Sequence, residues 1–260
     1  MGKIVAVANQ KGGVGKTTTA VNLAAELGAL RKKVLLVDLD PQGNSTTGLG
    51  IDKRGLTKST YSVLTGETPA VDAIVRTSAE NVLVLPTDNN LAGATIELVS
   101  AADRVERLKI CLRSLRPAFD YILIDCPPSL ELLTLNALVA ADTVLVPTQC
   151  EFFAMEGLSQ LVNSIRQVTK LYNPTLEIEG VLLTMFDSRL NLTMQVTSEI
   201  KRYFGPKVYA NTIPRSVRLS EAPSHGLPIR EYDRLSRGSE QYAAFAKEFL
   251  KRNGDAPNPA

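Results

Sequence analysis

Short apolar segments alternate with longer segments of helical periodicity along most of the chain. The apolar segments are rich in valine, isoleucine and leucine without polar alternation, which is typical of strands buried on both faces. They predict strands at residues 3–8, 33–38, 82–86, 121–125, 143–147, 178–184 and 208–213. The helical pattern predicts helices at residues 17–30, 92–115, 130–139, 156–171, 193–204 and 239–251.

This alternation predicts an α/β fold, with a mostly parallel, twisted sheet flanked by helices on both faces. No linker separates two cores, so we expect a single domain over residues 1–252. Residues 253–260 contain two prolines and no apolar anchor, and we expect them to be disordered. Residues 41–58 contain four glycines and predict a long functional loop.

The composition excludes several classes of site. A single histidine rules out a site with several histidine ligands, and Cys111, Cys126 and Cys150 form no C-x-x-C pair. Widely spaced cysteines argue against a disulfide scaffold or a zinc ribbon and fit a reducing compartment. No segment has the pattern of a signal peptide or a membrane-spanning helix, so we expect a cytoplasmic protein and no membrane association.

Charge is distributed unevenly along the chain. The formal net charge is +2, but residues 185–252 carry +5 and residues 1–184 carry −2. A basic C-terminal third indicates an anionic partner.

The strongest chemical signal is the run Lys11-Gly12-Gly13-Val14-Gly15-Lys16-Thr17-Thr18, which lies between a predicted strand and a predicted helix. Its glycines allow backbone N–H groups to converge on phosphate oxygens, and the helix N-terminus adds partial positive charge. We expect Lys16 to bridge the β- and γ-phosphates and Thr17 to ligate Mg²⁺. The run departs from G-x-x-x-x-G-K-[ST], because Gln10 replaces the first glycine and Lys11 is an additional lysine.

Carboxylates stand at the ends of two further predicted strands. Asp38 and Asp40 follow one apolar segment, and Asp125 ends another. In open parallel sheets the carboxyl ends of the strands border the ligand crevice. An aspartate there can hold Mg²⁺ directly or through a water molecule.

These three segments resemble the deviant Walker-A ATPases, and within them the ParA/Soj partition ATPases. The matching residues are 11–18, 38–44 and 125–129, with similar stretches at 149–157, 180–187 and 213–228. The resemblance implies a P-loop NTPase fold, ATP/ADP and Mg²⁺ as cofactors, and slow intrinsic ATP hydrolysis.

The resemblance also implies roles for individual residues. Two ATP molecules would lie between the subunits of a homodimer, and Lys11 would reach the partner's nucleotide. Lys16 and Asp40 would act in catalysis, with Asp40 positioning the attacking water. Thr17, Asp40 and Asp125 would support the metal.

The base pocket and the switch are implied in the same way. Pro214 would flank the adenine, while Met185 is either a second wall of that pocket or a core residue at the end of a strand. Residues 41–50 would respond to the γ-phosphate, with Gln42 as a residue that orients water or positions the loop.

The resemblance also implies that the ATP-bound dimer binds DNA non-specifically, which would account for the basic C-terminal third and place the protein on the nucleoid. Arg189 and Arg218 are the expected contacts, and Lys201, Arg202 and Lys207 are weaker candidates. A ParB/Spo0J-like protein would stimulate hydrolysis and release the dimer.

Two alternatives share this ATPase core. A MinD-like membrane-cycling ATPase would need an amphipathic C-terminal helix, and Tyr242, Phe245 and Phe249 do recur at helical spacing. Docking of that helix on the core is the favoured interpretation. An iron–sulfur reductase would need cysteines that bridge two subunits, for which Cys126 and Cys150 are the candidates.

Overall fold

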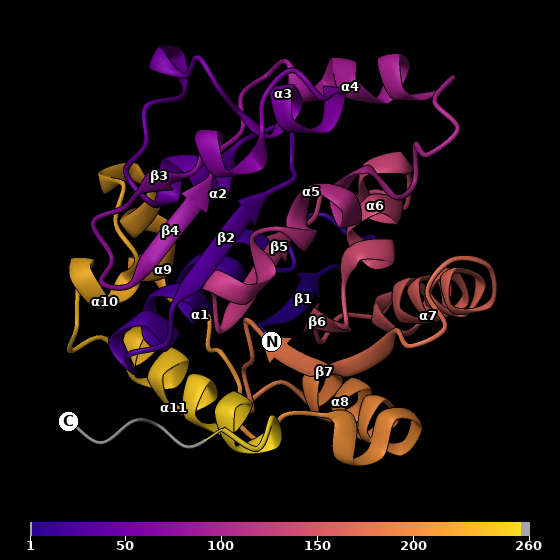
Figure 1. Ribbon diagram of the computed structural model, residues 1–260. Helices are drawn as coiled ribbons and strands as arrows, with labels where there is room; N and C mark the ends of the chain where they lie inside the picture. The colour runs from indigo at the N-terminus through magenta and orange to yellow at the C-terminus, as the bar shows by residue number, and fades with distance from the viewer. Residues whose placement is uncertain (1, 256–260) are drawn as a thin grey trace.

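The computed structural model describes residues 2–255, and a seven-stranded sheet forms its centre (Figure 1). The strand order is β3-β4-β2-β5-β1-β6-β7, and every pair is parallel except β3 with β4. The strands are β1 (Lys3–Val7), β2 (Val34–Asp38), β3 (Val75–Arg76), β4 (Val82–Leu85), β5 (Tyr121–Asp125), β6 (Thr143–Gln149) and β7 (Glu177–Thr184). The predicted fold class is confirmed.

Helices connect the strands and cover both faces of the sheet. The α-helices are α1 (Lys16–Ala29), α2 (Asn44–Gly48), α3 (Thr60–Thr65), α4 (Leu91–Leu98), α5 (Arg107–Arg113), α6 (Leu132–Ala140), α7 (Ala154–Leu171), α8 (Asn191–Phe204), α9 (Val217–Glu221), α10 (Ile229–Tyr232) and α11 (Arg237–Arg252). Short 3-10 helices are η1 (Lys53–Gly55), η2 (Ala70–Ala73), η3 (Arg116–Ala118), η4 (Gly205–Lys207) and η5 (Ala222–His225).

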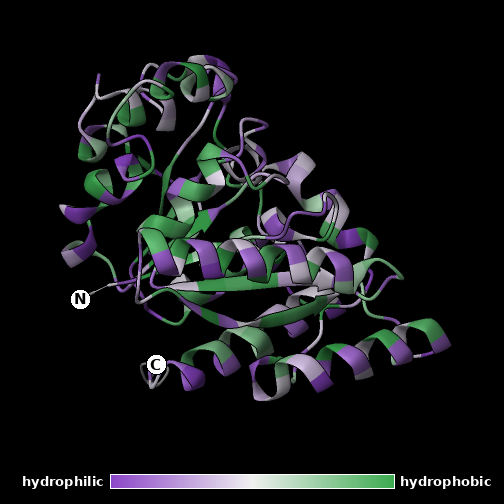
Figure 2. Cartoon of the chain, turned by 90° about the vertical axis from the view of Figure 1, so that its right-hand side faces the viewer, coloured by the Kyte–Doolittle hydropathy of each residue, from purple (hydrophilic) through white to green (hydrophobic). Residues whose placement is uncertain are grey.

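The sheet divides the apolar interior into two cores. Because successive side chains of a strand point to opposite faces, Ile4 and Ala6 of β1 enter one core and Val5 and Val7 enter the other. Helices α3 to α8 complete the first core, and α1, α10 and α11 complete the second. Figure 2 shows the consequence, with mostly hydrophobic strands between helices that alternate hydrophobic and hydrophilic residues.

Helix α11 packs its apolar face on the sheet. Tyr242, Phe245 and Phe249 are at most 1 % exposed, and the Tyr242 hydroxyl lies 3.2 Å from the Thr19 hydroxyl on α1. Among residues 2–255, no helix combines the length and apolar character that crossing a bilayer requires. The residues that the membrane-cycling alternative would insert into lipid therefore belong to the second core.

Two predicted elements are wrong. Residues 208–213 form no strand, because the N–H groups of Ala210 and Asn211 donate to the Glu248 carboxylate on α11 (2.9 Å each). The helix predicted at residues 92–115 is divided into α4 and α5. Asn136 on α6 separates them, since it donates to the Arg104 carbonyl (2.7 Å) and accepts from the Leu108 N–H (3.1 Å).

The segment 41–58 is more ordered than expected. Instead of a continuous loop, it contains α2 and η1. Ser45 and Thr46, the second and third residues of α2, are fully buried. The part of this segment around α2 is therefore packed against the core.

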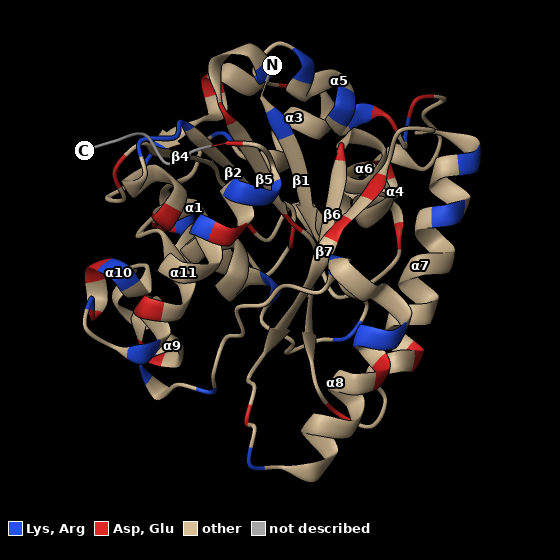
Figure 3. Ribbon diagram, turned by 90° about the horizontal axis from the view of Figure 1, so that it is seen from below, with Lys and Arg blue, Asp and Glu red and all other residues tan. Residues whose placement is uncertain are grey.

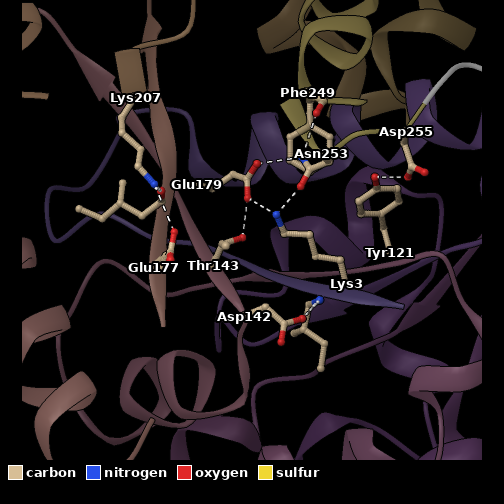
Figure 4. A network of polar contacts seen from close by, with 12 residues as sticks. Lys3, Tyr121, Asp142, Thr143, Glu177, Glu179, Lys207, Phe249, Asn253 and Asp255 are labelled. Atoms are coloured by element: carbon tan, nitrogen blue, oxygen red, sulfur yellow. Dashed lines mark hydrogen bonds and ion pairs between the residues drawn. The ribbon is translucent and has the colours of Figure 1, made fainter. Parts of the chain in front are cut away.

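The end of the chain is also held in place as far as it is described. Asn253 accepts from Lys3 and donates to Glu179 (2.8 Å), and Asp255 accepts from the Tyr121 hydroxyl (Figure 4). These contacts differ from the disorder predicted for residues 253–260. Residues 256–260 lie outside the described part of the chain.

Candidate nucleotide site

The glycine-rich run forms a loop that ends in the first turn of α1. Gly13 and Gly15 have φ angles of +74° and +85°, in the left-handed region that favours glycine. Gly15 is the residue preceding α1 and supplies no side-chain cap, so the first N–H groups of the helix keep no intrahelical or side-chain acceptor. The helix N-terminus is therefore available to an anion.

Two strands anchor this loop. The Thr184 hydroxyl at the end of β7 donates to the Val14 carbonyl (2.8 Å). Asn9 donates to the Pro147 carbonyl in β6 (2.8 Å) and accepts from the Lys11 N–H (3.1 Å). Asn9 and Thr184 were missed from the sequence, because their contacts join segments far apart in the chain.

The two lysines of the loop have different surroundings. Lys16 is 6 % exposed, and its ammonium donates to the Lys11 carbonyl (3.0 Å). Burial lowers the pKa of Lys16, and the negative charge of Asp125 opposes this shift. The Lys11 side chain is 38 % exposed and pairs with Glu151, another residue that sequence reasoning missed.

A pair of buried aspartates lies at the carboxyl ends of β2 and β5. Asp38 and Asp125 are directly opposite each other in the parallel register. One oxygen of Asp38 accepts from both the N–H (2.7 Å) and the hydroxyl (2.6 Å) of Thr46. Burial raises the pKa of both carboxyls, and their mutual repulsion adds to the shift at Asp125.

Asp125 has the features of a metal-supporting carboxylate. Its Oδ2 accepts from the Ser45 hydroxyl (2.7 Å), whereas its Oδ1 is buried without a hydrogen-bond partner among residues 2–255. Thr17 lies close enough for its hydroxyl to lower the pKa of Asp125. A buried, unpartnered carboxylate oxygen beside a threonine hydroxyl fits a hard cation such as Mg²⁺.

Asp40 reaches the same site from the segment after β2. It is 7 % exposed, and its Oδ1 accepts from the Gln42 N–H (3.0 Å). A cavity of about 310 Å³ brings together the predicted residues Gly12, Gly13, Gly15, Lys16, Thr17, Thr18, Asp40 and Met185, together with Gln42, Asn44 and Pro128. Segments around residues 12–18, 40–44, 128 and 185 thus meet at one end of the sheet.

A second cavity of about 340 Å³ continues from the first through Gly15, Thr18 and Met185. Met185 and Pro214 both line it, as predicted for a base pocket. Met185 is half-buried and has a φ angle of +49°. It is therefore a wall of both cavities rather than a core residue. Leu219 and Tyr242 add apolar surface that the sequence did not reveal.

The candidate DNA-binding arginines lie on separate exposed segments, the loop after β7 and helix α9. Arg189 follows β7 with its side chain 87 % exposed, and Arg218 on α9 is 56 % exposed. Lys207 does not join them. It bonds the Ile178 carbonyl (2.6 Å) at the opposite, amino end of β7 (Figure 4).

The cysteines do not form a cluster site. Cys126 is fully buried, Cys150 is 6 % exposed, and Cys111 is half-buried. Within residues 2–255, no group of three or more histidine, cysteine, aspartate or glutamate residues is arranged to hold a metal. A cluster shared between two subunits needs accessible thiolates, so the iron–sulfur alternative lacks its ligands.

Solved structures with similar folds hold nucleotides. Cobyrinic acid a,c-diamide synthase from Mycobacterium smegmatis, solved with ADP and magnesium, is 39 % identical with a TM-score of 0.86, covering 98 % of this chain and 96 % of that one. The septum site-determining protein MinD from Pyrococcus horikoshii, solved with Mg-ADP, is 27 % identical with a TM-score of 0.82, covering 98 % of both chains.

Sequence comparisons are more specific. The AAA domain family matches residues 2–178. The sporulation initiation inhibitor protein Soj of Bacillus subtilis is 57 % identical over 95 % of this chain and 98 % of its own length. The chromosome partitioning protein ParA of Myxococcus xanthus is 51 % identical over 97 % and 89 %. With this similarity over nearly the whole chain and the site described above, the chain belongs to the ParA/Soj family of chromosome-partitioning ATPases.

Proposed function

We propose that this protein is a DNA-segregation ATPase whose ATP-bound dimer binds DNA without sequence preference. The observation that carries the proposal is the convergence of Lys16, Thr17 and Asp40 on one cavity beside a helix N-terminus. The buried, unpartnered Oδ1 of Asp125 lies behind this lining, close to Thr17. Such a site offers charge stabilisation and positioning, which is what phosphoryl transfer requires.

Each residue has a distinct part in hydrolysis. The N–H groups at the start of α1 and the ammonium of Lys16 bind the phosphates, and Thr17 and Asp125 would hold Mg²⁺. When bound, Mg²⁺ neutralises charge that develops on the phosphate oxygens. Asp40, fixed by the Gln42 N–H, orients the attacking water.

Lys11 provides the connection between ATP and dimer formation. Among residues 2–255 its side chain pairs only with Glu151, which is itself 44 % exposed. An ion pair this exposed contributes little free energy, so a phosphate of a second subunit competes with it readily. Lys11 would then neutralise the partner's ATP, and a ParB-like protein would trigger hydrolysis and release.

DNA binding by the purified protein tests this proposal. Affinity for two unrelated duplexes is measured with no nucleotide, with ADP, with ATP and with a non-hydrolysable ATP analogue, each at two salt concentrations. We expect binding only with ATP or the analogue, equal for both sequences and lost at high salt. Absence of DNA binding in every nucleotide state would contradict the DNA-segregation function, and only the proposed ATP binding and hydrolysis would remain.

A further inference from the structure

A hollow of about 670 Å³ opens between the loop after β7, the segment before α9 and the first residue of α11. Three arginines line it, namely Arg189, Arg215 and Arg237. It borders the base cavity through Pro214 and Arg215, but no residue of the phosphate-binding loop lines it. The phosphates of a nucleotide bound at that loop therefore stay outside the hollow, while its base would lie on the other side of Pro214 and Arg215.

The arginines predicted from the sequence are already neutralised by neighbouring carboxylates. Arg189 donates to both oxygens of Asp187 (2.9 and 2.7 Å). Arg218 pairs with Glu221 (3.0 Å) and Asp233 (3.4 Å). An incoming phosphate has to compete with these carboxylates.

The other two arginines of the hollow form no such pairs. Arg215 and Arg237 are exposed, and neither side chain makes a hydrogen bond or ion pair with another residue in the described range 2–255. Asp187 is the only carboxylate among the lining residues. Hydrogen bonds from Arg189 lower its pKa to about 2, and the charge of Arg237 contributes. Since Asp187 neutralises one arginine, the lining keeps two positive charges.

Two unpaired guanidinium groups beside an open hollow fit a phosphodiester. A guanidinium binds two phosphate oxygens at once, and here no existing ion pair has to break first. We propose that Arg215 and Arg237 hold a backbone phosphate of DNA in this hollow, with Arg189 and Arg218 flanking it. This assignment rests on the proposed DNA binding and names the contacts that carry it.

The extent of the basic surface favours DNA over a single free anion. Arg218 lies on α9, whose first residue, Val217, lines the hollow, so basic side chains also occur on the element that borders it. Basic segments occur on α9 and on the loop before α8 at the same end of the molecule (Figure 3). A single free anion needs no basic side chains outside the hollow, whereas a DNA strand carries further phosphates for them to contact.

The test compares Arg215→Gln, Arg237→Gln and the double variant with wild type, using the full chain and a non-hydrolysable ATP analogue. Arg166→Gln is the matched control, because Arg166 is exposed on α7 and lines none of these cavities. Fluorescence anisotropy gives affinities for two unrelated duplexes over a salt series. Thermal unfolding shows that each variant is folded.

We expect each single variant to weaken binding equally for both duplexes and to reduce the slope of log K against log salt by about 0.9. Between about 50 and 200 mM salt, its loss of affinity should then be about threefold smaller than that of wild type. Arg215→Lys should keep most of the slope, since it keeps the charge.

Two outcomes overturn the proposal and can be told apart. If wild type binds DNA and the folded double variant matches Arg166→Gln in affinity and slope, the hollow is not the DNA site. If wild type binds neither duplex in any nucleotide state, the DNA-segregation function fails, and this site fails with it.

Discussion

The ammonium of Lys53 donates a 2.6 Å hydrogen bond to the carbonyl of Gln42. The stem of Lys53 crosses directly over Gly43, where a Cβ atom would lie 2.6 Å from the lysine Cδ. Gly43 also has a φ angle of +62°, so glycine is required there for two reasons. Lys53 therefore holds the turn whose N–H groups position Asp40.

We expect Lys53→Met to lower kcat for ATP hydrolysis by about tenfold with little change in KM, because a misplaced Asp40 orients water poorly. Lys53→Arg should recover most of the rate, since it keeps a donor. Arg54→Met is the control, because Arg54 is 95 % exposed and far less constrained. A KM that rises while kcat is unchanged would show that Lys53 acts on nucleotide binding instead.

Asp40→Ala should bind ATP but fail to hydrolyse it, because the phosphate-binding N–H groups and Lys16 are untouched. The variant should then remain an ATP-bound dimer. Size-exclusion chromatography with light scattering, with and without ATP, measures this directly. An Asp40→Ala protein that stays monomeric with ATP would show that Asp40 is needed for dimer formation rather than for hydrolysis.

Gly12→Val should retain nucleotide binding and lose ATP-dependent dimer formation. A Cβ at Gly12 would meet only the Pro128 Cβ at 3.9 Å, so the single chain accommodates the larger side chain. The added bulk projects beside Lys11, where the second subunit would approach. Calorimetry gives the ATP affinity and light scattering gives the mass. Gly55→Val is the control, since Gly55 also faces open space. A normal ATP-dependent dimer of Gly12→Val would place the interface elsewhere.

The ligand-free protein should lose stability as the pH rises from acidic to neutral values. Burial raises the pKa values of Asp38 and Asp125 above those of the unfolded chain, and repulsion from Asp40 adds to the shift at Asp38 as repulsion from Asp38 does at Asp125. Such a carboxyl binds its proton more tightly in the folded chain than in the unfolded chain. Its contribution to stability is complete at a pH below the pKa of the unfolded chain, and it is lost as the pH rises through the pKa of the folded chain.

Asp38→Asn should therefore raise the free energy of unfolding at about pH 8, by roughly 1 kcal/mol or more, and have a smaller effect at about pH 5. Thermal unfolding without nucleotide or metal at both pH values checks this. Asp72→Asn is the control, because Asp72 is exposed. Equal effects at the two pH values would show that the buried charge is not what limits stability.

The sequence alone predicted the parallel strands and the phosphate-binding loop, because both depend on local patterns. Fully apolar segments such as Tyr121–Asp125 identify buried strands. The spacing of Gly13, Gly15 and Lys16 identifies a loop that opens a helix. The edge strand β3 was missed, since its two residues are too short for any periodicity.

The errors occurred where a distant side chain replaces a backbone partner. Between α4 and α5, the side chain of Asn136 binds the Arg104 carbonyl, which a continuous helix would use in its own hydrogen bonding. At residues 208–213, the Glu248 carboxylate accepts from two backbone N–H groups that a strand would use. Whether a side chain replaces a backbone hydrogen-bond partner depends on which elements lie next to each other in the folded chain. Local periodicity carries no information about them.

The sequence by itself determined which residues can bind phosphate and where the acidic strand ends lie, because these are properties of short segments. Only the tertiary structure decided which carboxylate oxygen lacks a partner among residues 2–255, that Lys53 holds the Gln42 carbonyl, and which arginines form no ion pair within that range. Each of these depends on residues far apart in the chain, and their distances are set when the two cores pack against the sheet.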